Sequence, residues 1–376
     1  MGKERPTEVS ATADLSATKQ EFVRLRLPIT PPFAPMEART ASEIPTESDW
    51  IYEPKWDGFR CIAFREQSKV ELQSKAGQPL TRYFPELVRE LLQVKAERFV
   101  LDAEIVIETN QRLDFNALLQ RVHPAESRVQ RLSKATPAML LCFDLLVDAD
   151  GKSLVREPLF KRKTSLEMFF QKHVPTSLKK SVCLSPSSKE PQQALGWLTE
   201  LAAYGCDGII AKLKDEPYHS GDRDAMVKVK RIRTADCVIG GFRHAQKKEQ
   251  GVGSVLLGLY DDFGDLNHVG YSSSFAAIDK KDLLKKLQSV AGPPGFTGKA
   301  PGGPSRWTRA QERSTEWEPV KPVLVCEVQY DHFSGGRFRH GTKFLRWRPE
   351  KAPKSCTYEQ LEVPATKVKP PRRKAS

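Results

Sequence analysis

The sequence has no apolar run of membrane-spanning length among its 376 residues, and its N-terminus has no signal-peptide core. Its seven cysteines form no Cys-x-x-Cys pair, so their spacing supports neither a zinc knuckle nor a disulfide framework. An odd number of thiols is typical of a protein in a reducing cytosol. These absences predict a cytoplasmic protein that is not embedded in a membrane.

Acidic residues are also in deficit, with 47 Asp and Glu against 60 Lys and Arg and a net charge of +13. Such an excess predicts a polyanionic partner, most simply nucleic acid, with an anionic membrane as the alternative. The excess is uneven, since residues 337–376 contain 12 Lys and Arg but 3 acids. We predict a basic tail at residues 365–376 and, from its polar composition, a disordered tail at residues 1–26.

Residues 27–233 mix strand patterns and helical spacings without regular strand–helix–strand units, which indicates an α+β fold. The residues Glu66–Lys69 separate two strand patterns and predict an antiparallel hairpin. In the strong strand pattern Phe99–Ile107, Asp102 and Glu104 share one face, and apolar residues occupy the other. We predict strands at 50–55, 59–65, 70–74, 99–107, 138–147, 206–213 and 226–232, and helices at 83–95, 113–122, 161–173 and 192–204.

Residues 234–364 have a different pattern of short strands around a single helix. Five short strands and one helix are what an oligonucleotide-binding (OB) barrel requires, so we predict a second domain of this type. A loop rich in Gly and Pro occupies residues 292–305. The predicted strands are 237–242, 254–260, 266–271, 323–330 and 343–348, and the predicted helix is 280–290.

The stretch from Glu53 to Arg60, Glu-Pro-Lys-Trp-Asp-Gly-Phe-Arg, places Lys55 just before an Asp-Gly turn signal and a strand. The pattern Lys-x-Asp-Gly is weak by itself, and a solvated charge cluster is its ordinary interpretation. A lysine nucleophile has to lose its proton, and nearby cations lower the pKa of a lysine. Arg60, Lys228 and Lys230 are the candidates for that effect.

Later stretches supply other chemical groups, each with a simpler alternative. Lys228 and Lys230 alternate along one strand and would grip an α-phosphate, or they form an exposed basic edge. The two acids on the strand at 99–107 would bind ribose hydroxyls or a metal, or they face solvent. Phe143 would stack on a purine or belong to the core, and Asp207 would hold Mg²⁺ through its oxygens.

Taken in order, these stretches resemble the motifs of the covalent nucleotidyltransferases, a superfamily of DNA ligases, RNA ligases and mRNA capping enzymes. Residues 337–341 and 355–361, on either side of a sixth motif at 346–351, are similar to bacterial ATP-dependent DNA ligases of the C type. The similarity extends from about Pro31 to Glu362. It implies two domains: an ATP-grasp-like adenylation (nucleotidyltransferase) domain built on antiparallel sheet, then the OB barrel.

The resemblance implies a monomeric enzyme that uses ATP and Mg²⁺ or Mn²⁺ to seal nicks in duplex DNA, in repair and beside the nucleoid. Lys55 would attack the α-phosphorus of ATP and carry AMP. The nucleotide would be bound by Glu53, Arg60, Lys75, Glu104, Phe143, Ile210, Lys228 and Lys230. The metal would be bound by Asp207 and Glu104, and the pyrophosphate by Arg348 and Lys351. The residues expected to contact DNA are Arg337, Arg339, Arg346, Lys367, Arg372 and Arg373.

The sequence departs from the usual motifs at Lys75, Asp207, Met226 and Glu350, where Arg, Glu, Trp and Asp are commoner. Lys75 lacks the guanidinium group with which Arg donates two parallel hydrogen bonds. Asp207 is one methylene shorter than Glu as a metal ligand. An RNA ligase and a capping-type guanylyltransferase share the lysine chemistry and are the nearest alternatives. A catalytically silent nucleic-acid-binding module is the alternative from another class. A NAD-dependent ligase is disfavoured, because such enzymes carry a cysteine zinc module.

Overall fold

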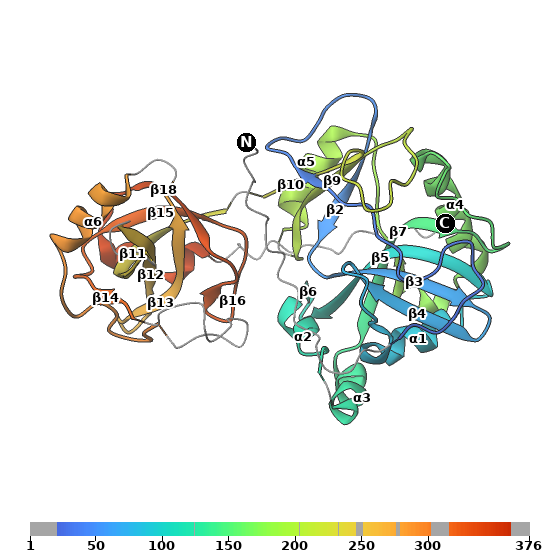
Figure 1. Ribbon diagram of the computed structural model, residues 1–376, viewed down its shortest axis with the longest axis horizontal. Coiled ribbons are helices and arrows are strands. Elements are labelled where there is room, and N and C mark those ends of the chain that lie inside the picture. The colour runs from blue at the N-terminus through green and yellow to red at the C-terminus, as the bar shows by residue number, and fades with distance from the viewer. Residues whose placement is uncertain are drawn as a thin grey trace, which may run out of the picture. The chain divides into compact units, whose positions relative to one another are not determined.

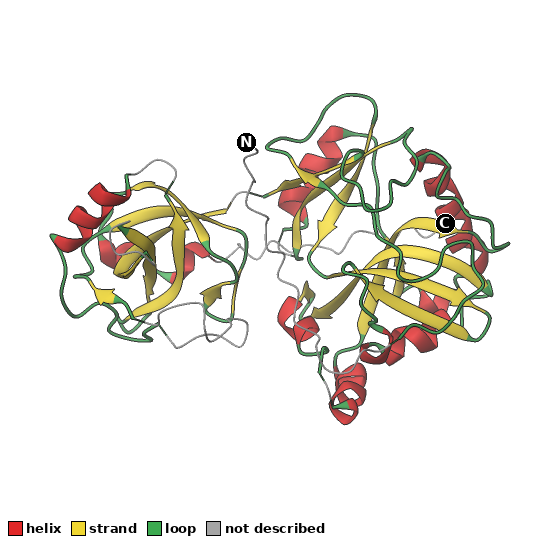
Figure 2. Ribbon diagram, in the orientation of Figure 1, coloured by secondary structure: helices red, strands yellow, loops and turns green. Residues whose placement is uncertain are grey.

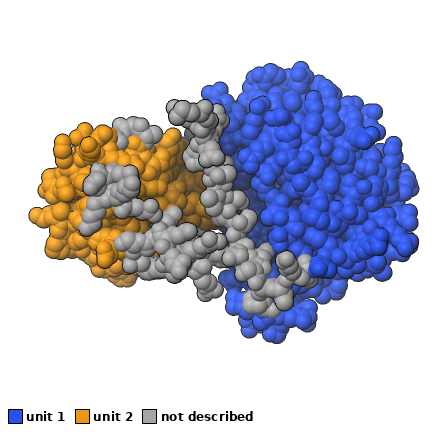
Figure 3. All heavy atoms as spheres, viewed as in Figure 1, with its two compact units in different colours: residues 1–230, 365–376 blue, residues 231–364 orange. Residues whose placement is uncertain are grey.

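The computed structural model describes residues 21–123, 125–202, 204–231, 233–245, 251–275, 279–301 and 316–361. The described residues from 21 to 230 belong to one compact unit, and those from 231 to 361 belong to a second (Figure 3). Within the described part of the chain, no helix is long and apolar enough to cross a membrane.

The first unit contains a large sheet with the strand order β4–β3–β5–β7–β8, and β6 pairs with β5 (Figure 1). Strands β3 and β4 form the predicted hairpin, in which Glu66 pairs with Lys69 and Gln67 has a φ of 53°. The strands are β3 (Phe59–Glu66), β4 (Lys69–Ser74), β5 (Arg98–Thr109), β6 (Arg112–Leu113), β7 (Ala138–Val147) and β8 (Val182–Leu184).

A smaller sheet in the same unit has the order β1–β10–β9–β2. Its strands are β1 (Arg39–Thr40), β2 (Trp50–Trp56), β9 (Cys206–Leu213) and β10 (Met226–Lys230). The expectation of antiparallel sheet is corrected here, because β1 runs parallel to β10 and β8 runs parallel to β7. Both parallel partners are edge strands of two or three residues, added to a core of antiparallel pairs.

Strand β5 has two different faces, as its alternating sequence predicts. Leu101, Ala103 and Ile105 pack in an apolar core with residues of α1 and α4, such as Leu87 and Phe169. On the opposite face, Val100 and Val106 belong to clusters that include residues of the smaller sheet. Asp102 and Glu104 are on that second face, so they are directed toward the smaller sheet.

Helices cover the first unit unevenly (Figure 2). The predicted helix at 83–95 is shorter, because Pro85 begins α1 and a 3-10 turn at Thr81–Tyr83 precedes it. The helix predicted at 113–122 has only five residues in the structure, and Asp114 is its N-cap. The polar helix α3 was not predicted, since few of its residues are apolar. The helices are α1 (Pro85–Leu91), α2 (Phe115–Leu119), α3 (Glu126–Ala135), α4 (Leu159–His173) and α5 (Pro191–Glu200), with another 3-10 turn at Thr176–Leu178.

The second unit contains all five predicted strands and the predicted helix. Strand β11 pairs with both β12 and β15, and the pairings continue through β13 and β18, so that the circuit returns to β11. Strand β18 runs parallel to β13, and the other pairs in this circuit are antiparallel. The elements are β11 (Arg233–His244), β12 (Val252–Tyr260), β13 (Leu266–Ser274), α6 (Lys280–Gln288), β14 (Glu318–Pro319), β15 (Val325–Tyr330), β16 (Phe333–Ser334), β17 (Arg337–Phe338), β18 (Thr342–Trp347) and the 3-10 turns Pro353–Ser355 and Tyr358–Leu361.

Candidate active site

Lys55 lies near the end of β2, directly opposite Gly208 of β9. The register shifts at the next pair, so Asp207 is an extra residue on β9 at a bulge. The bulge brings the carboxylate to the lysine, with 2.9 Å between Lys55 Nζ and Asp207 Oδ2. A Cβ at Gly208 would lie 2.3 Å from the carbonyl oxygen of Val229, so glycine is required opposite Lys55. The lysine side chain is 22% exposed, which leaves it partly buried but accessible.

Five residues that the sequence predicts around the nucleotide lie in two neighbouring rows of paired residues, or rungs, across the smaller sheet. Residues directly opposite one another, or two apart on a strand, point to the same face of a sheet. The two rungs are Glu53–Ile210–Lys228 and Lys55–Gly208–Lys230, on β2, β9 and β10 in turn. The nucleophile candidate, two candidate phosphate-binding lysines and two candidate base contacts are therefore on one face.

The electrostatic surroundings of Lys55 differ from the expectation. Burial lowers the pKa of Lys55, but the carboxylates of Asp207, Asp57 and Glu104 outweigh burial, and the pKa is raised. The prediction that neighbouring cations lower this pKa is therefore wrong for this arrangement. The physical reason is proximity, because a carboxylate lies in hydrogen-bond contact with the ammonium group.

The pKa of Glu104 is also raised, but for a carboxyl group this shift favours the uncharged form. Burial on the inner face of β5 is the main cause that raises its pKa to about 7. The charges of Arg60 and Lys55 lower the pKa, and those of Asp57 and Asp102 raise it, without reversing the effect of burial. This carboxyl group therefore exchanges its proton near neutral pH.

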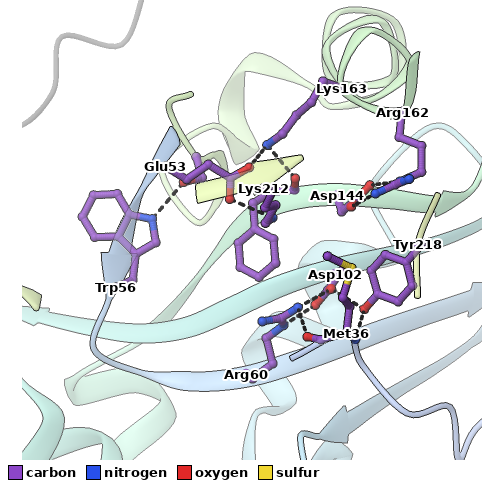
Figure 4. A network of polar contacts seen from close by, with 12 residues as sticks. Met36, Glu53, Trp56, Arg60, Asp102, Asp144, Arg162, Lys163, Lys212 and Tyr218 are labelled. Carbon is purple, nitrogen blue, oxygen red and sulfur yellow. Dashed lines mark hydrogen bonds and ion pairs between the residues drawn. The ribbon is translucent and has the colours of Figure 1, made fainter. Parts of the chain in front are cut away.

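Arg60 forms an ion pair with the buried carboxylate of Asp102 (Figure 4). Asp102 accepts hydrogen bonds from Arg60 Nε and Nη2 at 2.5 and 2.6 Å and from the hydroxyl of Tyr218 at 2.7 Å. The Arg60 guanidinium also lies over the ring of Phe143, 4.6 Å from its centroid. Asp102 is fully buried, so it does not face solvent. Its two hydrogen bonds to Arg60 hold the guanidinium group in place.

Glu53 lies between two lysines that come from different elements (Figure 4). Lys212 Nζ of β9 is 2.8 Å from Glu53 Oε2, and Lys163 of α4 forms an ion pair with Oε1. Burial raises the pKa of Glu53, but the two lysines outweigh burial, and the pKa is lowered. Lys212 is also 4.5 Å from the centroid of the Phe143 ring. The acid and the aromatic ring predicted to contact the base thus share a lysine.

Lys75 is held in a different contact from the other predicted nucleotide residues. Its ammonium lies 3.2 Å from Glu37, which also pairs with Arg223 at 2.7 Å. The side chain of Lys75 is 51% exposed. Glu37 follows Met36, whose carbonyl oxygen accepts a hydrogen bond from Arg60, so the two regions adjoin through the backbone.

The predicted cations of the second unit form a network with acids of that unit. Arg348 lies 2.8 Å from Asp236 and 2.5 Å from Glu350, and Lys351 lies 3.2 Å from Asp236. Arg346 pairs with Glu327 at 2.7 Å. Two further predicted DNA contacts are on or beside β17, namely Arg337 and Arg339. Lys367, Arg372 and Arg373 lie outside the described residues.

Comparison with known protein families decides the class of this site. A family described as "ATP dependent DNA ligase domain" matches residues 35–230, and "ATP dependent DNA ligase C terminal region" matches residues 248–351. The chain belongs to the ATP-dependent DNA ligases. The quoted motifs from Glu53 to Lys230 and the sixth motif at 346–351 fall within these matched regions, and residues 355–361 lie just beyond the second.

Individual relatives agree with the C-type resemblance, which is confirmed. DNA ligase C1 of Mycolicibacterium smegmatis is 42% identical over 348 residues, covering 90% of this ligase and 96% of the relative. DNA ligase C of Mycobacterium tuberculosis is 39% identical over 354 residues, covering 91% and 97%. Among solved structures, a Lig E DNA ligase is similar over 84% of this chain and 99% of its own, with a TM-score of 0.51 and 15% identity, which shows a likeness of fold alone.

Sequence reasoning missed several residues of the ligase site, among them Tyr218, Lys212 and the pair Arg162 and Lys163. Arg162 and Lys163 lie in the first turns of α4, and both are buried. Arg162 donates to both oxygens of Asp144 at 2.9 and 3.0 Å, and Lys163 donates to the carbonyl oxygen of Phe143 at 2.7 Å. A signal was present, because Lys163 is four residues after Leu159 and three before Leu166, which puts it on the apolar face of a helix.

Proposed function

We propose that this ligase seals nicks in duplex DNA through a covalent AMP on Lys55. The amine of Lys55 attacks the α-phosphorus of ATP, an N–P bond forms, and pyrophosphate leaves. The AMP then passes to a 5′-phosphate oxygen at the nick, and the 3′-hydroxyl attacks that phosphate and releases AMP. The observation that carries this proposal is the shared face of the smaller sheet, which groups Lys55 with the other nucleotide-site candidates.

The raised pKa of Lys55 imposes one requirement on the first step. The ammonium has to give up a proton before it attacks, because a protonated amine has no free electron pair. Asp207 is the candidate acceptor, since its Oδ2 lies 2.9 Å from Nζ. Arrival of ATP phosphates next to Lys228 and Lys230 would bring the reacting phosphorus to the same face of the sheet.

We assign the remaining nucleotide contacts from the same arrangement. Glu53 accepts a hydrogen bond from the amino group of adenine, and Phe143 and Ile210 cover the two faces of the base. Arg60, Glu104 and Lys75 serve the ribose side, and Lys228 and Lys230 bind the α-phosphate. The support is their position on facing strands, together with the contact of Arg60 with the Phe143 ring.

We propose Mg²⁺ as the metal, with Asp207 and Glu104 as its protein ligands and Mn²⁺ as a substitute. No group of three or more His, Cys, Asp or Glu residues among the described residues could hold a metal by itself. That scarcity fits Mg²⁺, which commonly takes one or two carboxylates and completes its shell with water and substrate phosphates. Bound there, the ion would neutralise negative charge on the phosphates.

We propose that the second unit, with boundaries at residues 234–364, is an OB barrel that contacts DNA. The closed circuit of pairings among β11, β12, β13, β18 and β15 supports a barrel. Arg348 and Lys351 would serve pyrophosphate, and Arg337, Arg339, Arg346 and the tail would contact DNA phosphates. We propose further that the enzyme acts as a monomer in DNA repair, in the cytoplasm where its DNA substrate lies.

Labelling with α-labelled ATP tests the nucleophile. Wild-type protein is expected to retain a covalent label on a denaturing gel, and Lys55→Ala is expected to lose it. Lys161→Ala is the matched control, because that lysine is 58% exposed and pairs only weakly with Glu157 at 3.4 Å. An undiminished label on Lys55→Ala would overturn the assignment.

The choice of substrate is tested separately with nicked duplexes. Labelled wild-type protein is expected to seal a DNA nick in the presence of Mg²⁺. Sealing confined to an RNA nick would favour the RNA-ligase alternative, and transfer of GMP to an RNA end would favour the capping alternative. Absence of a covalent label on the wild type from both α-labelled ATP and α-labelled GTP would leave only the silent nucleic-acid-binding module.

A further inference from the structure

Lys163 joins two parts of the base site that are far apart in the sequence. Its ammonium donates to the backbone carbonyl oxygen of Phe143 on β7 at 2.7 Å and forms an ion pair with Glu53 on β2 (Figure 4). Its side chain is 9% exposed, and that of Glu53 is 3% exposed. A single buried cation therefore fixes the relative positions of the acid and the aromatic residue.

The charges around Glu53 leave it with acceptor capacity. An ionised carboxylate offers about four lone-pair positions on its two oxygens. Lys163 is paired with Oε1 and Lys212 with Oε2 at 2.8 Å, so each oxygen retains room for a further hydrogen bond. The lysines keep the group anionic in a place where burial would otherwise neutralise it, and an anionic group can accept a hydrogen bond without donating one.

The position of Lys163 is fixed further by the contacts of its neighbour, Arg162. Arg162 forms a two-pronged ion pair with Asp144, at 2.9 and 3.0 Å, and also donates to the carbonyl oxygen of Glu157 at 2.7 Å. Consecutive cations of α4 thus bind consecutive residues of β7, Phe143 and Asp144. This double attachment leaves Lys163 little freedom to follow Glu53 if that carboxylate moves.

We propose that Lys163 is a positioning residue that fixes Glu53 as an ionised acceptor for the exocyclic amino group of the nucleotide base, and so sets the preference of the ligase for adenine. The proposal rests on the proposed function, in which Glu53 contacts that amino group. It assigns the specificity to a residue of α4, which lies outside the nucleotidyltransferase motifs that the sequence displays.

The test compares covalent labelling by ATP with labelling by purine riboside triphosphate, which lacks the 6-amino group. Wild type and the control Lys161→Met are expected to prefer ATP equally. In Lys163→Met the preference is expected to fall about tenfold or more, as loss of a hydrogen bond to a charged group predicts. Lys163→Arg keeps the charge and is expected to retain most of the preference.

A pH profile separates positioning from mere structural support. The charged groups around Glu53 are Lys163 of α4 and Lys212 of β9, with Asp144 of β7 and Arg60 of β3 acting on Lys212. In Lys163→Met only Lys212 still opposes burial, so the pKa of Glu53 is expected to rise, and labelling of this variant by ATP relative to wild type is expected to fall as the pH is lowered. Glu104 and Lys55 titrate in every variant, so the quantity compared is labelling relative to wild type at each pH, and for Lys161→Met this ratio is expected to stay constant.

The possible results lead to different conclusions. If Lys163→Met keeps the base preference and its labelling relative to wild type does not change with pH, the inference about Lys163 is wrong while the proposed function stands. If wild type forms no covalent adduct, the proposed function itself fails. Should Lys163→Met not fold, Lys163→Gln replaces it, because glutamine can still donate to the Phe143 carbonyl without a charge, and the same two outcomes apply.

Discussion

Replacing Glu104 with glutamine is expected to stabilise the folded ligase at alkaline pH and to have no such effect at acid pH. Burial raises the pKa of Glu104 from its ordinary value of 4.5 to about 7. The folded state therefore binds this proton more tightly than the unfolded state does. The free energy of unfolding falls as pH rises from 4.5 to 7, and it is level, for this group, outside that window.

The size of the effect follows from the shift in pKa. At a pH above both values, ionised Glu104 costs the folded state at most about 3 kcal/mol, because its side chain retains some access to solvent. Glutamine has a similar shape and carries no charge. The difference in unfolding free energy between Glu104→Gln and wild type is thus expected to be near zero at about pH 4 and to approach about 3 kcal/mol at about pH 8.

Urea unfolding of the first unit, measured from about pH 4 to about pH 8.5, gives this difference directly. Glu97→Gln is the matched control, since Glu97 is an exposed glutamate just before β5, and its difference from wild type is expected to stay small at every pH. A difference for Glu104→Gln that does not change with pH would refute the reasoning. The same variant is expected to label poorly with ATP, because the carboxylate that destabilises the fold is the proposed ligand of the metal and the ribose.

Three further predictions concern the metal, the second unit and the tail. Asp207→Asn is expected to raise the Mg²⁺ concentration needed for sealing, and an unchanged Mg²⁺ titration would remove Asp207 from the metal site. Arg348→Ala is expected to react poorly with ATP yet seal pre-adenylated DNA, whereas equal reductions in both assays would assign Arg348 to folding through its Asp236 pair or to DNA binding. Deleting residues 366–376 is expected to leave labelling intact and to flatten the salt dependence of DNA binding, by about one in slope for each DNA phosphate that the tail neutralises; an unchanged slope would show that the tail does not touch DNA.

Local patterns in the sequence are enough to predict most of the strands. The alternation in Phe99–Ile107 puts Asp102 and Glu104 on one face, and the structure has them there, directed toward the smaller sheet. Strand β9 begins and ends where its apolar pattern does, at Cys206 and Leu213. A period of two is a short-range property of the chain, so it survives whatever the strand later packs against.

The pairing of charges is not predictable from such patterns. Asp102 and Glu104 share a face but have different surroundings. Arg60 and Tyr218 donate hydrogen bonds to Asp102, whereas burial raises the pKa of Glu104. Tyr218 lies 116 residues after Asp102, in a stretch with no regular spacing. The raised pKa of Lys55 likewise depends on a bulge that aims Asp207 at it. Only the three-dimensional arrangement decides which of several nearby charges is closest.

The spacing of the ligase motifs has a common physical cause. Glu53 and Lys55, Ile210 and Lys212, and Lys228 and Lys230 are each two residues apart, because each pair is the contribution of one strand to the same face of one sheet. A motif of this kind is visible in sequence because the pleat forces the spacing. Lys163 comes instead from a helix that packs against the site, so the helical period shows only that a lysine lies on an apolar face and not what that lysine contacts. Residues that support such a site from helices are therefore the ones for which sequence motifs give no warning, and they have to be found from their contacts in the folded chain.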